Sequence, residues 1–147
     1  MANKILCPIS GILENRLVLD AAYNIAKDLN SHLEVLHVKT EAKESIPLLG
    51  EGMSVAMVED MISIAEKESD ERLKRAQVVF DASVAKHGLP IADEPVGDER
   101  RASVAWRVET GREDEVVARL GRLSDLIVIG RPGETDDVLT PMTLNAA

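Results

Sequence analysis

The chain has 147 residues, of which 17 are basic and 26 acidic, giving a formal charge of −9, and 45% of its residues are apolar. This length suits one domain with its own core, and the acidic excess argues against binding to nucleic acid or to an anionic membrane surface. The single Cys cannot form an internal disulfide, and we find no secretory signal. The sequence therefore predicts a cytoplasmic protein with neither nucleic acid nor membrane as a partner.

The first third of the chain has the pattern strand, helix, strand. Residues 4–9 form a short apolar run that ends at Ser10 and Gly11, as a buried strand ending in a turn does. Apolar residues recur every three or four positions over 15–30, which predicts an amphipathic helix. Branched residues over 33–38 predict a second strand, before which His32 is expected to face solvent. This unit implies a right-handed parallel crossover.

A long helical excursion is predicted over about 53–88. Apolar residues follow the helical period from about residue 54 to 86, and His87 with Gly88 supplies a stop signal. The middle of this helix, 66–75, is almost wholly charged. We interpret that run as a solvated face, and the alternative is that the overhanging turns contact a partner.

The second half of the chain repeats the alternation of strand and helix. Residues 103–108 predict a third strand and residues 113–123 a short amphipathic helix. The apolar run over 125–130 predicts a central parallel strand that is buried on both faces. The fold class is therefore α/β, with an open doubly wound parallel sheet.

Three segments resemble one known family. They are residues 4–11 (KILCPISG), 35–38 (VLHV) and 124–133 (SDLIVIGRPG), and they resemble the universal stress protein, or UspA-like, domain. The resemblance implies a five-stranded sheet of order 3-2-1-4-5, of the adenine nucleotide alpha hydrolase-like kind. Some members of that family bind ATP between the ends of strands one and four, and others do not.

The nucleotide-binding motif of that family is only partly matched. The motif is Gly, two residues, Gly, nine residues, then Gly followed by Ser or Thr, with an acidic residue at the end of strand one. Gly130 and Gly133 match, whereas Ser10 replaces the acid and Thr143-Leu144 replaces the distal pair. A Cβ at the third glycine hinders the approach to phosphate, and Leu144 supplies no donor. The residues implied to line a degenerate nucleotide site are Pro8, Ile9, Ser10, Val38, Gly130, Arg131, Gly133 and Thr143.

Three functions of different classes remain open. The first is a stress-response module that acts through protein association, and the alternative is an ATP- or ADP-binding switch with at most slow hydrolysis, using ATP with Mg²⁺. The third is an adenylating enzyme on a related sheet, whose further loop residues are missing here. No Gly-x-Ser-x-Gly elbow occurs, and no His, Cys or carboxylate pair has metal-ligand spacing. The sequence therefore predicts no catalytic residue and no metal site, which favours a role other than that of an enzyme.

The end of the chain bears on assembly. Thr140 and Pro141 form a helix-start signature with only six residues after it. We therefore expect residues 1–147 to form one UspA-like domain of strand order 3-2-1-4 that lacks the usual fifth strand. We also expect it to be a truncated first domain of a tandem protein. A sheet that stops at strand four presents an apolar edge over 126–129. This edge, together with the dimeric state that the family resemblance implies, predicts a homodimer or a tandem-domain partner.

Overall fold

The computed structural model describes residues 4–12, 14–45, 52–96 and 101–131. The elements in chain order are β1 (Lys4–Pro8), α1 (Asn15–Leu29), β2 (His32–Lys39), α2 (Ala42–Ser45), α3 (Val55–His87), β3 (Ser103–Thr110), α4 (Glu113–Gly121) and β4 (Leu126–Ile127). The described strands form one parallel sheet of order β3-β2-β1-β4. The predicted fold class and strand order are confirmed. The expected helix at Thr140-Pro141 lies outside the described residues.

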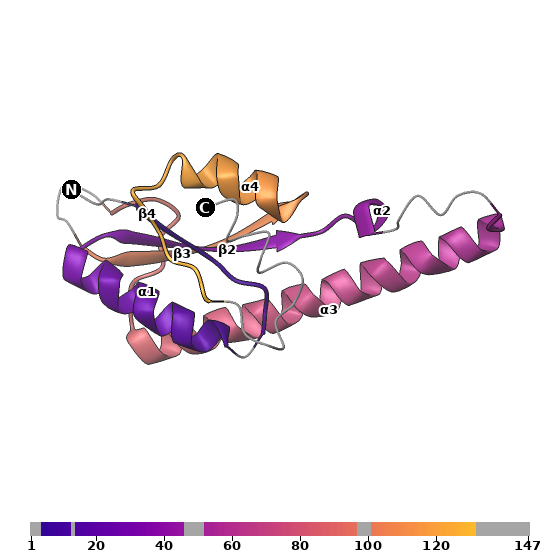
Figure 1. Cartoon of the computed structure of the whole chain (residues 1–147). Coiled ribbons are helices and arrows are strands. Elements are labelled where there is room, and N and C mark those ends of the chain that lie inside the picture. Colours follow the sequence, from indigo (N-terminus) through magenta and orange to yellow (C-terminus); the bar gives the residue numbers. More distant parts are fainter. Residues whose placement is uncertain (1–3, 13, 46–51, 97–100, 132–147) are drawn as a thin grey trace.

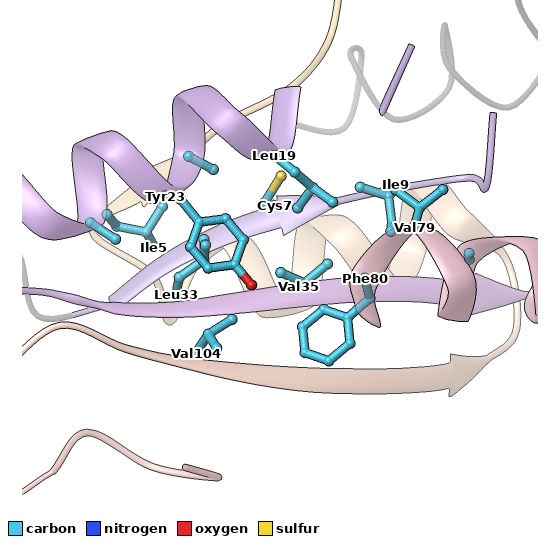
Figure 2. Packing of buried hydrophobic residues seen from close by; sticks show 13 residues of the cluster. Ile5, Cys7, Ile9, Leu19, Tyr23, Leu33, Val35, Val79, Phe80 and Val104 are labelled. Carbon is cyan, nitrogen blue, oxygen red and sulfur yellow. The ribbon is translucent and has the colours of Figure 1, made fainter. Parts of the chain in front are cut away.

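Helices cover both faces of the sheet, with α1 and α3 on one side and α4 on the other (Figure 1). Because side chains alternate along a strand, β1 sends Ile5 and Cys7 toward α1 and α3 and Leu6 toward α4. The larger core lies under α1 and α3, where Tyr23 and Phe80 pack over the sheet (Figure 2). The smaller core lies under α4, so the sheet is doubly wound as predicted. Within the described residues, no helix has the length and apolar composition needed to cross a bilayer.

The predicted limits of the long helix are confirmed. Ser54 caps α3 by accepting a hydrogen bond from the Met57 N–H at 3.2 Å, and Gly88 ends it with φ of 66°. A helix of 33 residues is about 50 Å long, and Figure 1 shows it extending well beyond the sheet. Its buried residues all lie between Ala76 and Ser83. The N-terminal half of α3 therefore projects past the body of the domain.

The projecting half of α3 is held from one side by the end of β2 and the segment after it. The Lys39 ammonium lies 2.6 Å from the Asp70 carboxylate, and the Ser69 hydroxyl donates to the Thr40 carbonyl at 3.2 Å. The short helix α2 packs here against α3 (Figure 1). The sequence did not predict α2, because four residues are too few to show a helical period.

Two expectations about individual strands are wrong. The run over 125–130 is typical of a central strand buried on both faces, but β4 has only two residues, pairs with β1 alone among the described strands, and leaves Leu126 36% exposed. His32 was expected to face solvent, but it is 2% exposed and its Nδ1 lies 2.8 Å from the Ser103 hydroxyl. The reason is that β2 lies between β1 and β3, so side chains at its start are enclosed.

Ring stacking joins α3 to the sheet and to α1. The half-buried Trp106 of β3 stacks on Phe80 of α3, with ring centroids 4.9 Å apart. His87 at the end of α3 stacks on Tyr23 of α1 at 4.4 Å, and its Nε2 lies 2.7 Å from the Asp20 carboxylate. These contacts fix the C-terminal half of α3 against the body of the domain.

Candidate functional site

A cavity of about 290 Å³ lies where the carboxyl ends of β1 and β4 meet the start of α1. The chain adds β2 and β3 on one side of β1 and β4 on the other, and open parallel sheets bind ligands at such a switch point. The cavity is therefore the candidate functional site. It is lined by Pro8, Ser10, Ile12, Glu14, Asn15, Leu17, Val18, Glu113, Ile129, Gly130 and Arg131.

One side-chain oxygen organises the loop between β1 and α1. The Asn15 Oδ1 accepts hydrogen bonds from the main-chain N–H groups of Ser10 at 3.1 Å, Gly11 at 2.9 Å and Ile12 at 3.1 Å. The Ser10 hydroxyl lies 3.5 Å from the same oxygen. Successive N–H groups that converge in this way form a concavity that attracts anions. Here the chain fills that concavity with its own carboxamide oxygen.

Gly11 holds the same loop against the long helix. Its φ of +93° lies in the region that side chains rarely adopt, and a Cβ there would lie 2.9 Å from the Arg72 carbonyl oxygen and 3.0 Å from the Ala76 nitrogen. Both of these atoms belong to the main chain of α3, so they have little freedom to move. The floor of the site is therefore locked to the helix that projects from the domain.

The charges around the cavity are mixed. Two carboxylates line it, those of Glu14 and Glu113, together with the guanidinium of Arg131. Glu113 is 8% exposed and is the first residue of α4, where the positive end of the helix dipole stabilises a carboxylate. Asp114 and Glu115 follow in the same turn. The N-terminus of α4 is thus already matched by negative charge.

The cavity gathers four of the residues expected at a nucleotide site, namely Pro8, Ser10, Gly130 and Arg131. The other two that are described lie elsewhere. Ile9 belongs to the core under α1 and α3, and Val38 to the core under α4. Gly133 and Thr143 fall outside the described residues.

Gly130 has a packing role that its place in a glycine motif did not suggest. A Cβ at this position would lie 2.7 Å from Cγ2 of Val18, so glycine lets the segment after β4 approach α1 closely.

Three polar residues that line the site were not predicted from the sequence: Glu14, Asn15 and Glu113. Asn at a helix start and Glu in a first turn are ordinary capping signals, so nothing marked them as lining a cavity.

Several titratable groups are buried away from the cavity. Burial raises the pKa of the Cys7 thiol to about 12. Burial also lowers the pKa of His37, whose Nδ1 lies 3.0 Å from the Ile9 carbonyl oxygen. The Glu34 carboxylate, only 4% exposed, is paired with Lys4 at 2.8 Å and with Arg107 at 3.2 Å. In the part of the chain that the structure describes, no three His, Cys, Asp or Glu side chains gather to hold a metal ion.

Comparison with known proteins gives matches in structure but not in sequence. No protein family model matches the chain, and no curated protein matches it. The universal stress protein UspA from Lactobacillus plantarum superposes with a TM-score of 0.65 at 15% identity, over 99% of this chain and 92% of that one. A universal stress protein family member from Burkholderia pseudomallei gives 0.52 at 20% identity, over 98% and 89%. The architecture, the strand order and these superpositions together show that the chain has the universal stress protein fold.

Proposed function

We propose that the chain is a universal stress protein-like module that acts in a stress response through association with other proteins and carries a degenerate nucleotide site. The observation that carries this proposal is the position of Asn15. Phosphate-binding loops at strand ends offer their main-chain N–H groups to the anion. Here the Asn15 oxygen takes three such groups, and a phosphate oxygen would have to displace it.

The charge and size of the cavity support the same proposal. Glu14 and Glu113 would both repel a polyphosphate, and a like charge at roughly 6 Å costs about 3 kcal/mol at an effective dielectric near 20, before screening. Arg131 also lines the cavity, and its positive charge opposes this repulsion. The volume of about 290 Å³ lies at the lower end of ligand pockets. A nucleotide with its phosphates is therefore a poor match for this site.

Isothermal titration of the chain with ATP and with ADP, each with Mg²⁺, tests the proposal. We expect no binding in the micromolar range, and micromolar binding by the unaltered chain would refute the degenerate site. A second arm compares Glu113→Gln with Glu115→Gln, which is in the same helix turn but does not line the cavity. If carboxylates in the cavity repel the nucleotide, only Glu113→Gln should increase the thermal shift at millimolar ATP.

An ATP- or ADP-binding switch is the second candidate. It is favoured by the meeting of Ser10, Gly130 and Arg131 around one cavity at the switch point of the sheet. This candidate predicts a thermal shift with ATP that Arg131→Ala reduces and Gly133→Val abolishes. The absence of any shift in the unaltered chain would exclude it. We assign no catalytic residue in either case.

A further inference from the structure

One face of α3 carries a regular three-four repeat along nearly its whole length. Its positions alternate in steps of four and three residues, and such a series stays on one side of a helix. Apolar residues occupy both ends of the series and charged residues its middle. We call these nine residues the α3 seam: Met57, Met61, Ile64, Glu68, Glu71, Arg75, Val78, Ala82 and Ala85.

The seam faces away from the described parts of the domain that contact α3, and all its side chains but the half-buried Met61 are exposed. Met57 is 55% exposed, Ile64 67% and Val78 61%. The contacts of α3 with the segment after β2 run through Ser69 and Asp70, on the opposite side of the helix from the seam. The core contacts of α3 run through a third side, which carries the buried residues between Ala76 and Ser83. The seam is therefore a solvent-facing surface, apolar at its two ends and charged in its middle, on a helix that is already fixed in place.

The seam is complementary to itself when one copy is reversed. An antiparallel partner with a two-fold axis at Glu71 brings Ile64 of one copy to Val78 of the other. It likewise pairs Met57 with Ala85, and it brings Met61 to within one residue, about 1.5 Å of helix rise, of the level of Ala82, so that large side chains meet small ones. Two-fold symmetry repeats each of these contacts on the other side of the axis.

The charges of the seam favour the antiparallel arrangement over the parallel one. Reversal brings Glu68 of each copy to within one residue of the level of Arg75 of the other, and these long side chains can then form two ion pairs that flank the axis, in exchange for the 3.5 Å contact of Glu68 with Arg72 of its own helix. Only Glu71 then meets its own copy. A parallel pair would instead place Glu68 on Glu68 and Arg75 on Arg75, and like charges facing each other across an interface are strongly unfavourable.

A groove beside the C-terminal end of the α3 seam adds a further contact that the partner's helix could make. A cavity of about 260 Å³ lies between α1 and α3 and includes Ala82 of the seam, with Arg16 and Lys86 among its lining residues. The antiparallel register brings the partner's Met61 close to Ala82 at this groove. The partner's turn beside Met61 carries Glu59 and Asp60, whose charges are opposite to that of Arg16, whereas Lys86 is already paired at 2.7 Å with Asp20, which also lines the groove.

We propose that two copies of this chain associate through the α3 seam as an antiparallel helix pair. The contact spans residues 57 to 85, which is four heptads and about 42 Å of helix. It uses neither the edge of the sheet at β4 nor the cavity at the end of β1. The proposal goes beyond the proposed function and does not depend on nucleotide binding.

Sedimentation equilibrium over a wide range of protein concentration tests the seam. We expect the unaltered chain to dimerise and Ile64→Glu to raise the dimer dissociation constant by about tenfold or more, because it buries a charge. Val55→Glu is the matched control, since Val55 is 75% exposed on the opposite side of the same helix and should leave the dimer intact. A monomeric unaltered chain, or equal dimerisation by both variants, would overturn the proposal.

Mixing two charge variants tests the register. Glu68→Arg alone and Arg75→Glu alone each create two like-charge contacts across an antiparallel pair, so each should weaken dimerisation by about tenfold or more. An equal mixture restores an opposite charge at both contacts and should recover the affinity of the unaltered chain. Circular dichroism confirms that each variant is folded. Single variants that dimerise normally, or a mixture that does not recover, would overturn the antiparallel register.

Discussion

Replacing Asn15 with Ala should weaken the domain by removing the oxygen on which three main-chain N–H groups converge. The hydrogen bonds from Ser10, Gly11 and Ile12 are all 3.1 Å or shorter. Each such bond contributes a net free energy of about 0.5–1.5 kcal/mol, and a buried donor left without a partner costs more. Water entering from the cavity can satisfy part of this loss. We therefore expect Asn15→Ala to lower the free energy of unfolding by about 2–4 kcal/mol.

That loss is large for a domain of this size. Total stabilities of about 5–15 kcal/mol are typical, and each kcal/mol corresponds to about 2–4 °C in Tm for chains near this length. Urea unfolding followed by circular dichroism measures the change. Asn24→Ala is the matched control, because Asn24 is exposed on the same helix and its loss should change the stability by less than about 0.5 kcal/mol.

Two results would refute the reasoning. The first is an Asn15→Ala variant no less stable than Asn24→Ala. The second comes from hydrogen exchange by NMR, which reports on the three donors separately. The amides of Ser10 and Gly11 should be protected in the unaltered chain and should exchange faster in the variant. If they exchange at the same rate in both, the Asn15 oxygen does not hold the loop.

Three further outcomes follow from the packing and the buried titratable groups. Gly11→Ala should lower the free energy of unfolding by about 2–5 kcal/mol, because Gly11 has a positive φ and a Cβ there would overlap the main chain of α3. Gly88→Ala should lower it by only about 1 kcal/mol, because nothing lies within 4 Å of a Cβ at that position. Equal losses of the two variants in urea unfolding would contradict the close contact at Gly11. Burial lowers the pKa of His37, so below pH about 6.5 the imidazole takes up a proton in the unfolded chain but not in the folded one. The free energy of unfolding should therefore fall from pH 7 to 5, and less steeply in His37→Asn. Equal pH dependence of the free energy of unfolding in the two proteins would contradict this reasoning. Cys7, with a pKa of about 12, should resist iodoacetamide at pH 8 until urea unfolds the chain, as mass spectrometry can check.

The ends of the helices could be predicted because their signals are local. Ser54 and Gly88 mark the limits of α3 through bonds and dihedral angles that involve only neighbouring residues. The position of a strand within the sheet is instead decided by contacts with strands that are distant in the sequence. The apolar run over 125–130 is typical of a central strand, yet the described part of it pairs with β1 alone. The amino-acid composition of a segment indicates an apolar strand, but it does not indicate how many other strands pair with it.

The location of the candidate site in the fold could be predicted more readily than the side chains that line it. Ser10 and Arg131 follow the apolar runs predicted as strands one and four, and the resemblance to the family's nucleotide motif put them at the site, where both line the cavity. Ile9 and Val38 are next to strand ends too, but the alternation of the pleat turns them into the two cores. Asn15 could not be recognised, because its role depends on the directions in which three main-chain N–H groups of the preceding loop point.

The stacking of Trp106 on Phe80 gives the domain a built-in optical reporter. Trp106 is the only tryptophan in the sequence, so all indole fluorescence comes from one point on the surface of β3. That point lies under the C-terminal half of α3 and 6.4 Å from the ring of His37. The emission therefore responds to the docking of α3 on the sheet. Lifetime measurements on the unlabelled chain can follow this docking without a dye or an added tryptophan.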